Sequence, residues 1–405
     1  MANVSSSNGL EKRPKLRFPG FDEPWEHKEL LHYLVENTDR NKQLKFGKEN
    51  VLSVSGEYGI VNQIAFQGRS FAGESVADYH IVETDDIVYT KSPLKANPYG
   101  IIKVNNGVPG IVSTLYAVYH PLKTVVPRFV DFYFSNDLRL NKFLKPLVNI
   151  GAKHDMKVNN AFVLTGMVVF PPLREQQKIV DFLTILDRRI DVQRKKVEAL
   201  KKYKRGLLHG LISKTLRFSH KEKWERVKLG KVFKERSERA NGDEELLAVT
   251  INAGVQRRTN LDLKDNSSKD KSNYKRVQKG DIAYNTMRMW QGASGASMYD
   301  GIVSPAYTVI TPQAPNHVNI QFWAYYFKYA PLVQTFQKYS QGLTSDTWNL
   351  KFPQFSEIFV SNPPLEEQNE IATMLQAIDR RITSEEGRLS SICQMKSSLY
   401  AQLFI

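Results

Sequence analysis

One segment of the chain combines amide and guanidinium side chains in a short stretch that follows a predicted strand and ends on glycine. It runs Tyr284-Asn285-Thr286-Met287-Arg288-Met289-Trp290-Gln291-Gly292. Asn and Gln can pair with adenine through two hydrogen bonds, and Arg can pair in the same way with guanine. The candidate base-reading residues here are Tyr284, Asn285, Thr286, Arg288 and Gln291. A plainer interpretation places Met287, Met289 and Trp290 in a core, with Arg288 on a phosphate or in a salt bridge.

Two further segments have the composition of nucleic-acid contacts. In Thr250–Arg258, Gly254 permits close approach and the adjacent arginines suit phosphates, although an exposed turn with solvated charges is the alternative. Its candidates are Asn252, Gln256, Arg257 and Arg258. The polar segment 342–351 offers Thr344, Ser345, Trp348, Asn349 and Lys351.

The chain shows no convincing set of catalytic or metal-binding residues. Ser361-Asn362-Pro363-Pro364-Leu365 is similar to the Asn-Pro-Pro-aromatic motif of adenine methyltransferases, but Leu365 replaces the aromatic that stacks on the flipped base. There is no glycine-rich nucleotide fingerprint and no Cys/His spacing typical of zinc. The sequence therefore predicts a chain that is not an enzyme and that binds no metal or cofactor itself.

Composition narrows the class of partner. The 405 residues suffice for two to four domains, and 57 Lys and Arg against 42 Asp and Glu give a net charge of +15. Such an excess favours a polyanionic partner such as nucleic acid or an anionic membrane face. The single cysteine, Cys393, suits a reducing, cytoplasmic setting. No run approaches the roughly 18 to 20 apolar residues of a membrane-spanning helix, so we expect no membrane association.

The chain repeats itself at an offset of about 192 residues. Pro-Pro-Leu, Glu-Gln and Asp-Arg-Arg-Ile recur with identical spacing, at 171–190 in the first half and 363–382 in the second. Looser matches lie upstream, such as Gly110–Ser113 with Gly301–Ser304. Each half is thus a variable segment of about 150 residues followed by a well-matched segment of about 43.

The well-matched segments predict two long helices. Counted in heptads from Ile179 and Ile371, eight of ten seam positions are apolar in each copy, which is typical of a coiled coil. The polar exceptions fall at the same places, at Gln193 and Lys204 in the first copy and at Glu385 and Lys396 in the second. Residues 171–214 carry 12 basic and 5 acidic side chains, whereas 363–405 carry 4 and 6. Opposite net charges favour pairing of the two helices with each other; alternatively, each packs only on its own variable segment.

We therefore predict an α+β protein in which two α/β domains repeat with pseudo-twofold symmetry and are joined by two long helices that form an antiparallel coiled coil. Within the domains, the segments 127–145 and 319–340 predict amphipathic helices. The expected boundaries are a flexible N-terminal arm at 1–16, a first domain at 17–170, a first helix at 171–214, a second domain at 215–362 and a second helix at 363–405.

Two variable segments that each precede a Pro-Pro-Leu…Glu-Gln…Asp-Arg-Arg-Ile helix resemble, over residues 13–405, the specificity subunit of a type I restriction-modification system. The resemblance implies that each domain is a target-recognition domain for one half of a split DNA sequence, with the helices as a fixed-length spacer. It implies two adenine-specific DNA methyltransferase subunits as partners and, through them, ATP-driven restriction subunits. S-adenosylmethionine, ATP and Mg would belong to those partners.

Correspondence with the second half selects candidate DNA contacts in the first half. They are Ser55, Tyr58, Lys91, Ser92, Lys95, Asn97, Lys153, His154 and Lys157. Thr90-Lys91-Ser92-Pro93 stands where the second half has Asn285-Thr286-Met287-Arg288, and such divergence is what two different half-sites require. Two other classes of function stay open at this point. One is a non-catalytic scaffold with two protein-binding domains, and the other is a self-contained nuclease or methyltransferase.

Overall fold

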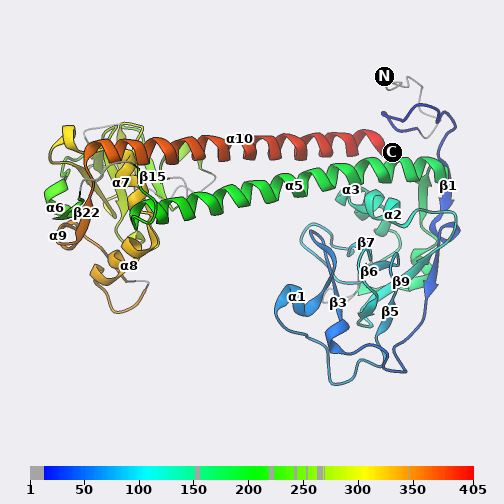
Figure 1. Ribbon diagram of the computed structural model, residues 1–405. Coiled ribbons are helices and arrows are strands. Elements are labelled where there is room, and N and C mark those ends of the chain that lie inside the picture. The colour runs from blue at the N-terminus through cyan, green and yellow to red at the C-terminus, as the bar shows by residue number, and fades with distance from the viewer. Residues whose placement is uncertain are drawn as a thin grey trace. The chain divides into compact units, whose positions relative to one another are not determined.

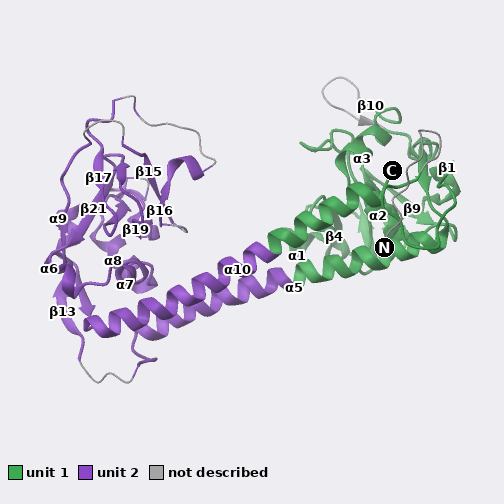
Figure 2. Ribbon diagram, turned by 90° about the horizontal axis from the view of Figure 1, so that it is seen from above, with its two compact units in different colours: residues 1–192, 389–405 green, residues 193–388 purple. Residues whose placement is uncertain are grey.

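The two heptad-bearing segments form the long helices α5 (Leu173–Ile212) and α10 (Leu365–Leu403) in a computed structural model of the chain (Figure 1). The structure describes residues 13–150, 156–218, 223–240, 244–251, 254–261, 268, 270–345 and 347–405. They fall into two compact units, which are unit 1 with residues 1–192 and 389–405 and unit 2 with residues 193–388 (Figure 2). Each unit contains part of both long helices.

Unit 1 is built around a four-stranded antiparallel sheet with the strand order β2-β9-β6-β7. Two-stranded antiparallel pairs surround it, namely β1 with β12, β3 with β4, β5 with β8 and β10 with β11. The strands are β1 (Glu26–Glu29), β2 (Leu34–Asn37), β3 (Leu52–Ser55), β4 (Gly59–Asn62), β5 (His80–Val82), β6 (Ile87–Thr90), β7 (Ile102–Val104), β8 (Gly110–Val112), β9 (Tyr116–Pro121), β10 (Asn149–Ile150), β11 (Met156–Lys157) and β12 (Met167–Phe170). The helices are α1 (Gln63–Gln67), α2 (Pro127–Phe134), α3 (Asp137–Leu144) and α4 (Asn160–Val163).

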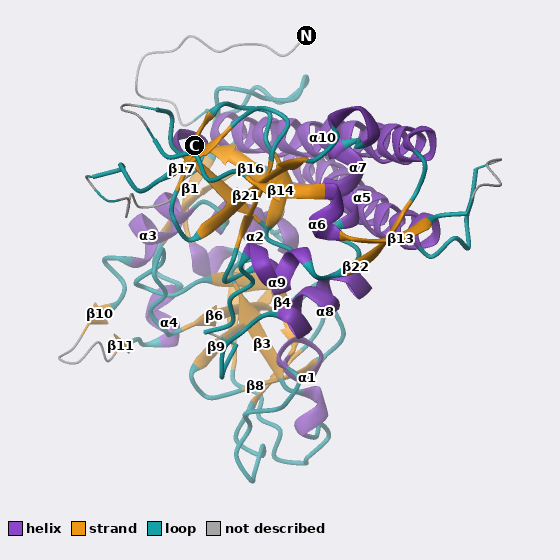
Figure 3. Cartoon of the chain, turned by 90° about the vertical axis from the view of Figure 1, so that its left-hand side faces the viewer, coloured by secondary structure: helices purple, strands orange, loops and turns teal. Residues whose placement is uncertain are grey.

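Unit 2 repeats this topology with the sheet order β14-β21-β18-β19 and the pairs β13 with β22, β15 with β16 and β17 with β20. Strands β13 and β22 lie side by side in Figure 3. Its strands are β13 (Glu225–Lys228), β14 (Phe233–Glu235), β15 (Leu247–Thr250), β16 (Gly254–Arg257), β17 (Lys275–Val277), β18 (Ile282–Asn285), β19 (Ser294–Ala296), β20 (Gly301–Val303), β21 (Tyr307–Pro312) and β22 (Phe359–Asn362). Its short helices are α6 (Leu229–Val232), α7 (Ile320–Tyr326), α8 (Ala330–Tyr339) and α9 (Phe352–Ser356). The repeat in the sequence is therefore a repeat in the fold.

One of the two central strands of each sheet, β6 in unit 1 and β18 in unit 2, is buried on both faces. Successive side chains of a strand point to opposite faces, and in β18 Ile282 and Tyr284 enter the large core shared with the helices. Ala283, between them, enters a second core formed with the small strand pairs. In unit 1, Ile87 and Val88 divide in the same way between two clusters. Each sheet thus lies between a helical layer and a layer of two-stranded pairs.

The predicted amphipathic helices at 127–145 and 319–340 are each two shorter helices, which corrects the sequence prediction. In the first segment, α2 ends before Asn136, whose side chain accepts a hydrogen bond from Arg139 N and caps α3. In the second segment, α8 begins with Pro331 in its first turn. Capping asparagines and helix-initiating prolines interrupt an apolar pattern that looks continuous in the sequence.

The end of the predicted flexible arm is held against unit 1. The backbone N–H of Leu16 donates to the carbonyl of Gln402, and the guanidinium of Arg17 forms two hydrogen bonds of 2.8 Å with the carboxylate of Glu175. Residues 1–12 of the predicted arm lie outside the described residues. The contact between Arg17 and Glu175 therefore holds the segment that leads into the first domain against the first turn of α5.

The glutamine that follows this glutamate joins each long helix to its own domain. Gln176 Oε1 accepts from Val126 N, directly before α2, and Gln176 Nε2 donates to Pro171 O. Gln368 does the same with Asn319 N, directly before α7, and with Pro363 O. The repeated Glu-Gln element therefore ties the helix start to the helix that covers the sheet.

The seam between α5 and α10 is apolar, as the heptads predict. In unit 1, Ile179, Leu183 and Leu186 of α5 and Leu403 of α10 are buried in one cluster. In unit 2, Leu207, Leu211, Ile371 and Leu375 are buried together. The prediction that the two helices pack on each other is confirmed.

The polar seam residues are paired across the helices. Gln193 Nε2 donates to Glu385 Oε2 at 2.7 Å, and Lys204 Nζ donates to Asp379 Oδ1 at 2.6 Å. In unit 1, Lys396 pairs with Asp187. Contacts in unit 2 link residues 193 and 196 to 385 and residue 204 to 379, so the helices run antiparallel there. Each seam lysine thus meets the aspartate of the repeated Asp-Arg-Arg-Ile element on the other helix.

Glu385 gives this pairing a pH dependence. Hydrogen bonds from Lys196 and Gln193 lower the pKa of Glu385 to about 2, whereas an unfolded glutamate titrates at about 4.3. Its ionised form therefore stabilises the fold above about pH 4.3, and that contribution is lost as the pH falls towards 2. We expect Glu385→Gln to lower the melting temperature at neutral pH and to make progressively less difference in acid.

Thermal unfolding of the full chain, followed by circular dichroism across this pH range, measures the effect. Glu386→Gln is the matched control, because Glu386 is the neighbouring residue and its pair with Lys201 is largely exposed and should contribute little at any pH. A stability loss in Glu385→Gln that is the same at all pH values would contradict this assignment.

Candidate nucleic-acid interface

The segment after β18 forms a tight loop whose backbone is fixed from within. Asn285 Oδ1 accepts from Met287 N, and Trp290 Nε1 donates to Met287 O. Gly292 closes the loop with a φ of +79°, in the left-handed region that favours glycine. Arg288 is exposed, and its guanidinium has no hydrogen-bond or ion-pair partner among the described residues. The loop therefore presents an unoccupied planar donor to solvent.

The hairpin β15–β16 lies directly against the strand that follows this loop. Gly254 has a φ of +66°, and a Cβ atom on Gly295 of β19 would come within 2.5 Å of the Gly254 Cα. Both positions therefore need glycine. Arg257, at the end of β16, pairs with Glu245 at 3.2 Å and lies over the ring of Tyr299.

The segment at 341–351 reaches the same loop. A bridge between Gln341 and Asn349 closes it, and Trp348 makes an edge contact with Trp290 at 5.2 Å between ring centroids. The backbone N–H of Leu350 donates to Thr286 O at 2.9 Å. Three candidate segments that are far apart in the sequence are therefore neighbours in unit 2.

A lysine that no motif indicated joins two of these segments. Lys328, just after α7, donates from Nζ to the carbonyl of Ile251 at 2.9 Å and to the carbonyl of Gly292. Burial, with a smaller contribution from the charge of Lys204, lowers the pKa of Lys328 to about 8.

The corresponding segments of unit 1 carry different side chains. Ser55 Oγ accepts from the backbone N–H groups of Glu57 and Tyr58 and so shapes the β3–β4 turn. Tyr58 is 59% exposed and contacts Phe66. Lys91 Nζ donates to Asn160 Oδ1 at 3.2 Å. Burial lowers the pKa of Lys91. Ser92 and Lys95 are exposed.

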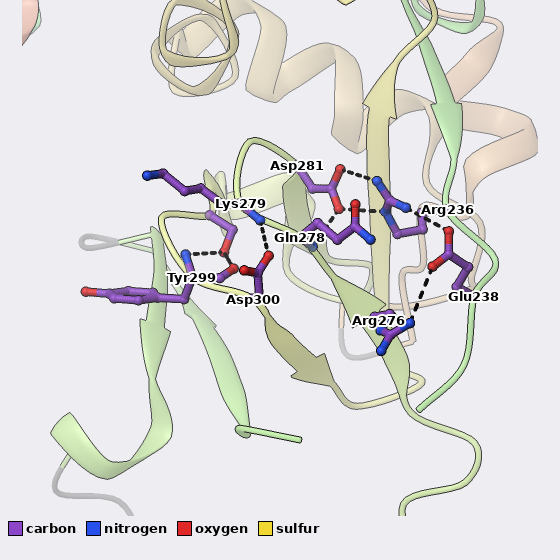
Figure 4. A network of polar contacts seen from close by, with 9 residues as sticks. Arg236, Glu238, Arg276, Gln278, Lys279, Asp281, Tyr299 and Asp300 are labelled. Carbon is purple, nitrogen blue, oxygen red and sulfur yellow. Dashed lines mark hydrogen bonds and ion pairs between the residues drawn. The ribbon is translucent and has the colours of Figure 1, made fainter. Parts of the chain in front are cut away.

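An ion pair holds the other end of β18. Asp281, directly before the strand, accepts from Arg236 Nε at 2.7 Å and Arg236 Nη2 at 3.1 Å, and also from the backbone N–H of Gln278 (Figure 4). Arg236 also pairs with Glu238. Asp281 is buried, so its charge depends on these donors.

In unit 1 the corresponding aspartate is Asp86. It pairs with His120 and accepts from the backbone N–H of Glu83. Burial raises the pKa of Asp86, and the hydrogen bonds only partly oppose this. The corresponding strands β6 and β18 are therefore held by different ion pairs, Asp86 with His120 in unit 1 and Asp281 with Arg236 in unit 2.

No three His, Cys, Asp or Glu side chains within the described ranges are placed to hold a metal ion together. Among the helices of those ranges, none has the length and hydropathy to cross a membrane.

Comparison with known proteins identifies the family. The model of the type I restriction modification DNA specificity domain matches residues 67–202 and again 221–394. The chain belongs to this family.

Solved structures agree on the fold. The S subunit of a type I restriction-modification system from M. genitalium is similar with a TM-score of 0.56 and 14% identity, over 97% of this chain and 99% of that one. A chain from a study of complex assembly and conformational transition in the type I R-M system gives a TM-score of 0.54 at 14% identity, over 94% and 97%. The chain therefore has two type I DNA specificity domains and shares the fold of these S subunits.

Three candidate residues face the protein in these specificity domains, which corrects their prediction as DNA contacts. Tyr284 is 0% exposed because β18 extends through it, and its ring stacks on Phe355. Thr286 is buried and donates to Ala306 O. Asn97 is buried and donates to Asp137.

The remaining candidates differ in surroundings. Thr344, Ser345 and Lys351 are exposed, and Gln256, Arg258, Gln291, Trp348 and Asn349 are partly buried. Lys153, His154 and Asn252 lie outside the described residues, and the side chain of Lys157 is not described either. Sequence reasoning missed Lys328, because a single lysine at the end of an apolar segment gives no signal.

The Arg236–Asp281 pair yields a stability prediction for the second specificity domain. Arg236→Met should cost about 3 to 5 kcal/mol of unfolding free energy, because it leaves a buried carboxylate without its cation. Adding Asp281→Asn should recover part of that loss. Chemical denaturation of the full chain measures both.

Arg239→Met serves as the control, because Arg239 is exposed in the same unit and should change stability by about 0.5 kcal/mol or less. Equal losses for Arg236→Met and Arg239→Met would show that the ion pair does not support the domain.

Proposed function

We propose that this specificity subunit recognises a two-part DNA sequence, with one part bound by each specificity domain. The repetition of the fold carries the proposal, because the same strand-and-loop framework appears twice with different side chains at corresponding loops. Asn285-Thr286-Met287-Arg288 of unit 2 corresponds to Thr90-Lys91-Ser92-Pro93 of unit 1. Two frameworks with different side chains suit two different half-sites.

We further propose that α5 and α10 set the number of unread base pairs between the half-sites. A helix pair with a fixed register has a fixed length, which a purely apolar seam would not guarantee. The helix pair would also dock two adenine-specific DNA methyltransferase subunits and, through the complex, restriction subunits. Catalysis, with S-adenosylmethionine, ATP and Mg, would belong to those partners, and this chain would supply recognition alone.

The exposed, unpartnered guanidinium of Arg288 is suited to direct base reading. Arg288→Ala should cost about 1 to 3 kcal/mol at one base position and relax the preference there. Arg257→Ala is the matched comparison. The Arg257 guanidinium is already paired with Glu245, and we expect it to contact phosphates, so its loss should weaken binding to all DNA sequences alike. Competition binding of singly substituted duplexes by the complex with methyltransferase separates the two patterns. An equal loss on every duplex for Arg288→Ala would refute its base-reading role.

Helix length should act as a ruler. Removal of one heptad at facing positions of α5 and α10 shortens each helix by about 10 Å, at about 1.5 Å per residue. The gap between half-sites should then contract by about three base pairs of about 3.4 Å each, or binding should be lost. Methylation sequencing of a host that carries the variant with its methyltransferase reports the gap. A length-preserving replacement of exposed residues in the same heptads is the control, and an unchanged gap in the deletion variant would overturn the proposal.

A further inference from the structure

Lys328 connects two turns that belong to different layers of unit 2, because the loop after β18 joins strands of the central sheet and the β15–β16 turn belongs to a separate strand pair. Its ammonium donates to the carbonyl of Ile251, in the β15–β16 turn, and to the carbonyl of Gly292, which closes the loop after β18. The lysine stem passes beside Gly292, where a Cβ atom would lie 3.7 Å from Lys328 Cδ. Both acceptors are backbone carbonyls, so the contact fixes the course of the chain whatever side chains the turns carry.

The charge of Lys328 is not neutralised by an acid. Within the part of the chain that the structure describes, no carboxylate pairs with it, and its hydrogen bonds go to the two carbonyls. Hydrogen bonds from a charged donor are roughly twice as strong as neutral ones. A largely buried ammonium also loses solvation unless its donors are used, which makes release of either carbonyl unfavourable.

Helix α7, which directly precedes Lys328, is itself held in place. Tyr325, one turn earlier, donates from its hydroxyl to Asp379 Oδ2 at 2.7 Å, and Asp379 is the partner of Lys204 in the helix seam. At its start, α7 is held by Gln368 through Asn319 N. Helix α7 thus has a fixed place on α10 within unit 2, and Lys328 extends that fixed frame to the two turns.

Unit 1 holds the corresponding turns differently. By the offset that aligns α2 with α7, Phe132 stands in place of Tyr325 and Ser135 in place of Lys328. The hydroxyl of Ser135 donates to Phe132 O on its own helix. A defect at Lys328 should therefore affect one domain and leave the other as an internal reference.

We propose that Lys328 is a positioning residue for sequence recognition by unit 2. It holds Ile251, directly after β15, and Gly292, which closes the loop after β18, in the single arrangement that reads the half-site. The inference rests on the proposed function, in which the Arg288 loop contacts bases. Lys328 itself lies behind the loops and acts through their backbones.

The test uses the full chain assembled with its methyltransferase subunits and compares Lys328→Met, Lys328→Arg and Lys338→Met. Lys338 is an exposed lysine in α8 of the same unit and is the control. Methylation rates are measured on the cognate duplex and on duplexes with a single substitution in one half-site or the other.

In Lys328→Met, discrimination at one half-site should fall by about tenfold, the scale of one good base contact, while discrimination at the other half-site is retained. Lys328→Arg should recover most of the loss, because guanidinium also donates to carbonyls, and Lys338→Met should match the wild type. Unchanged discrimination in Lys328→Met, an equal loss at both half-sites, or a loss in Lys328→Arg as large as in Lys328→Met would overturn the inference.

Hydrogen–deuterium exchange of the DNA-free full chain tests the positioning role without relying on DNA. Amides of the β15–β16 turn and of the loop after β18 should exchange faster in Lys328→Met, with unit 1 unchanged. If exchange is faster but the wild-type complex has no sequence preference, the proposed function fails while the positioning contact stands. If the wild-type complex is sequence-specific and exchange is unchanged, only the Lys328 inference fails.

Discussion

The register of the helix pair depends on a few polar contacts inside an apolar seam. Apolar heptads alone tolerate a shift of seven residues, since each shifted position again meets an apolar partner. The contacts of Gln193 with Glu385 and of Lys204 with Asp379 in unit 2, and of Lys396 with Asp187 in unit 1, would all be lost in such a shift. Because the aspartates belong to the repeated tetrapeptide, the sequence element that marks the repeat also determines how its two copies pair.

Hydrogen bonds to the backbone connect this seam to the short helices and loops of each domain. The repeated glutamine ties each long helix to the helix that covers its sheet, through Val126 in unit 1 and Asn319 in unit 2. In unit 2 the path continues through Tyr325 and Lys328 to the turns beside Arg288. The framework is thus specified by contacts that do not depend on loop side chains, which leaves those side chains free to differ between the domains.

Periodicity in the sequence was sufficient to predict the long helices, their pairing and the two-domain repeat. Heptads and a duplicated spacing can both be recognised in a single sequence without knowledge of tertiary contacts. Periodicity did not predict the ends of the short helices, because the cap at Asn136 and the helix-initiating Pro331 divide segments that the apolar pattern joins. Tyr284 was predicted at the end of a strand but was also counted among the DNA contacts of the next loop, because the composition of a strand end does not show which way its last side chain points. The role of Lys328 depends on carbonyls 77 and 36 residues away, and no pattern in one sequence encodes such tertiary contacts.

The register itself can be tested directly by placing cysteines at facing seam positions. In a Cys393→Ser background, Gln193→Cys with Glu385→Cys should oxidise rapidly to an intramolecular disulfide, because the two side chains are in contact. Gln193→Cys paired with a cysteine one heptad away, at Ile378 or Ile392, should not. Rapid, selective oxidation of the facing pair is the result that this account predicts, and equal oxidation of the shifted pairs would contradict it.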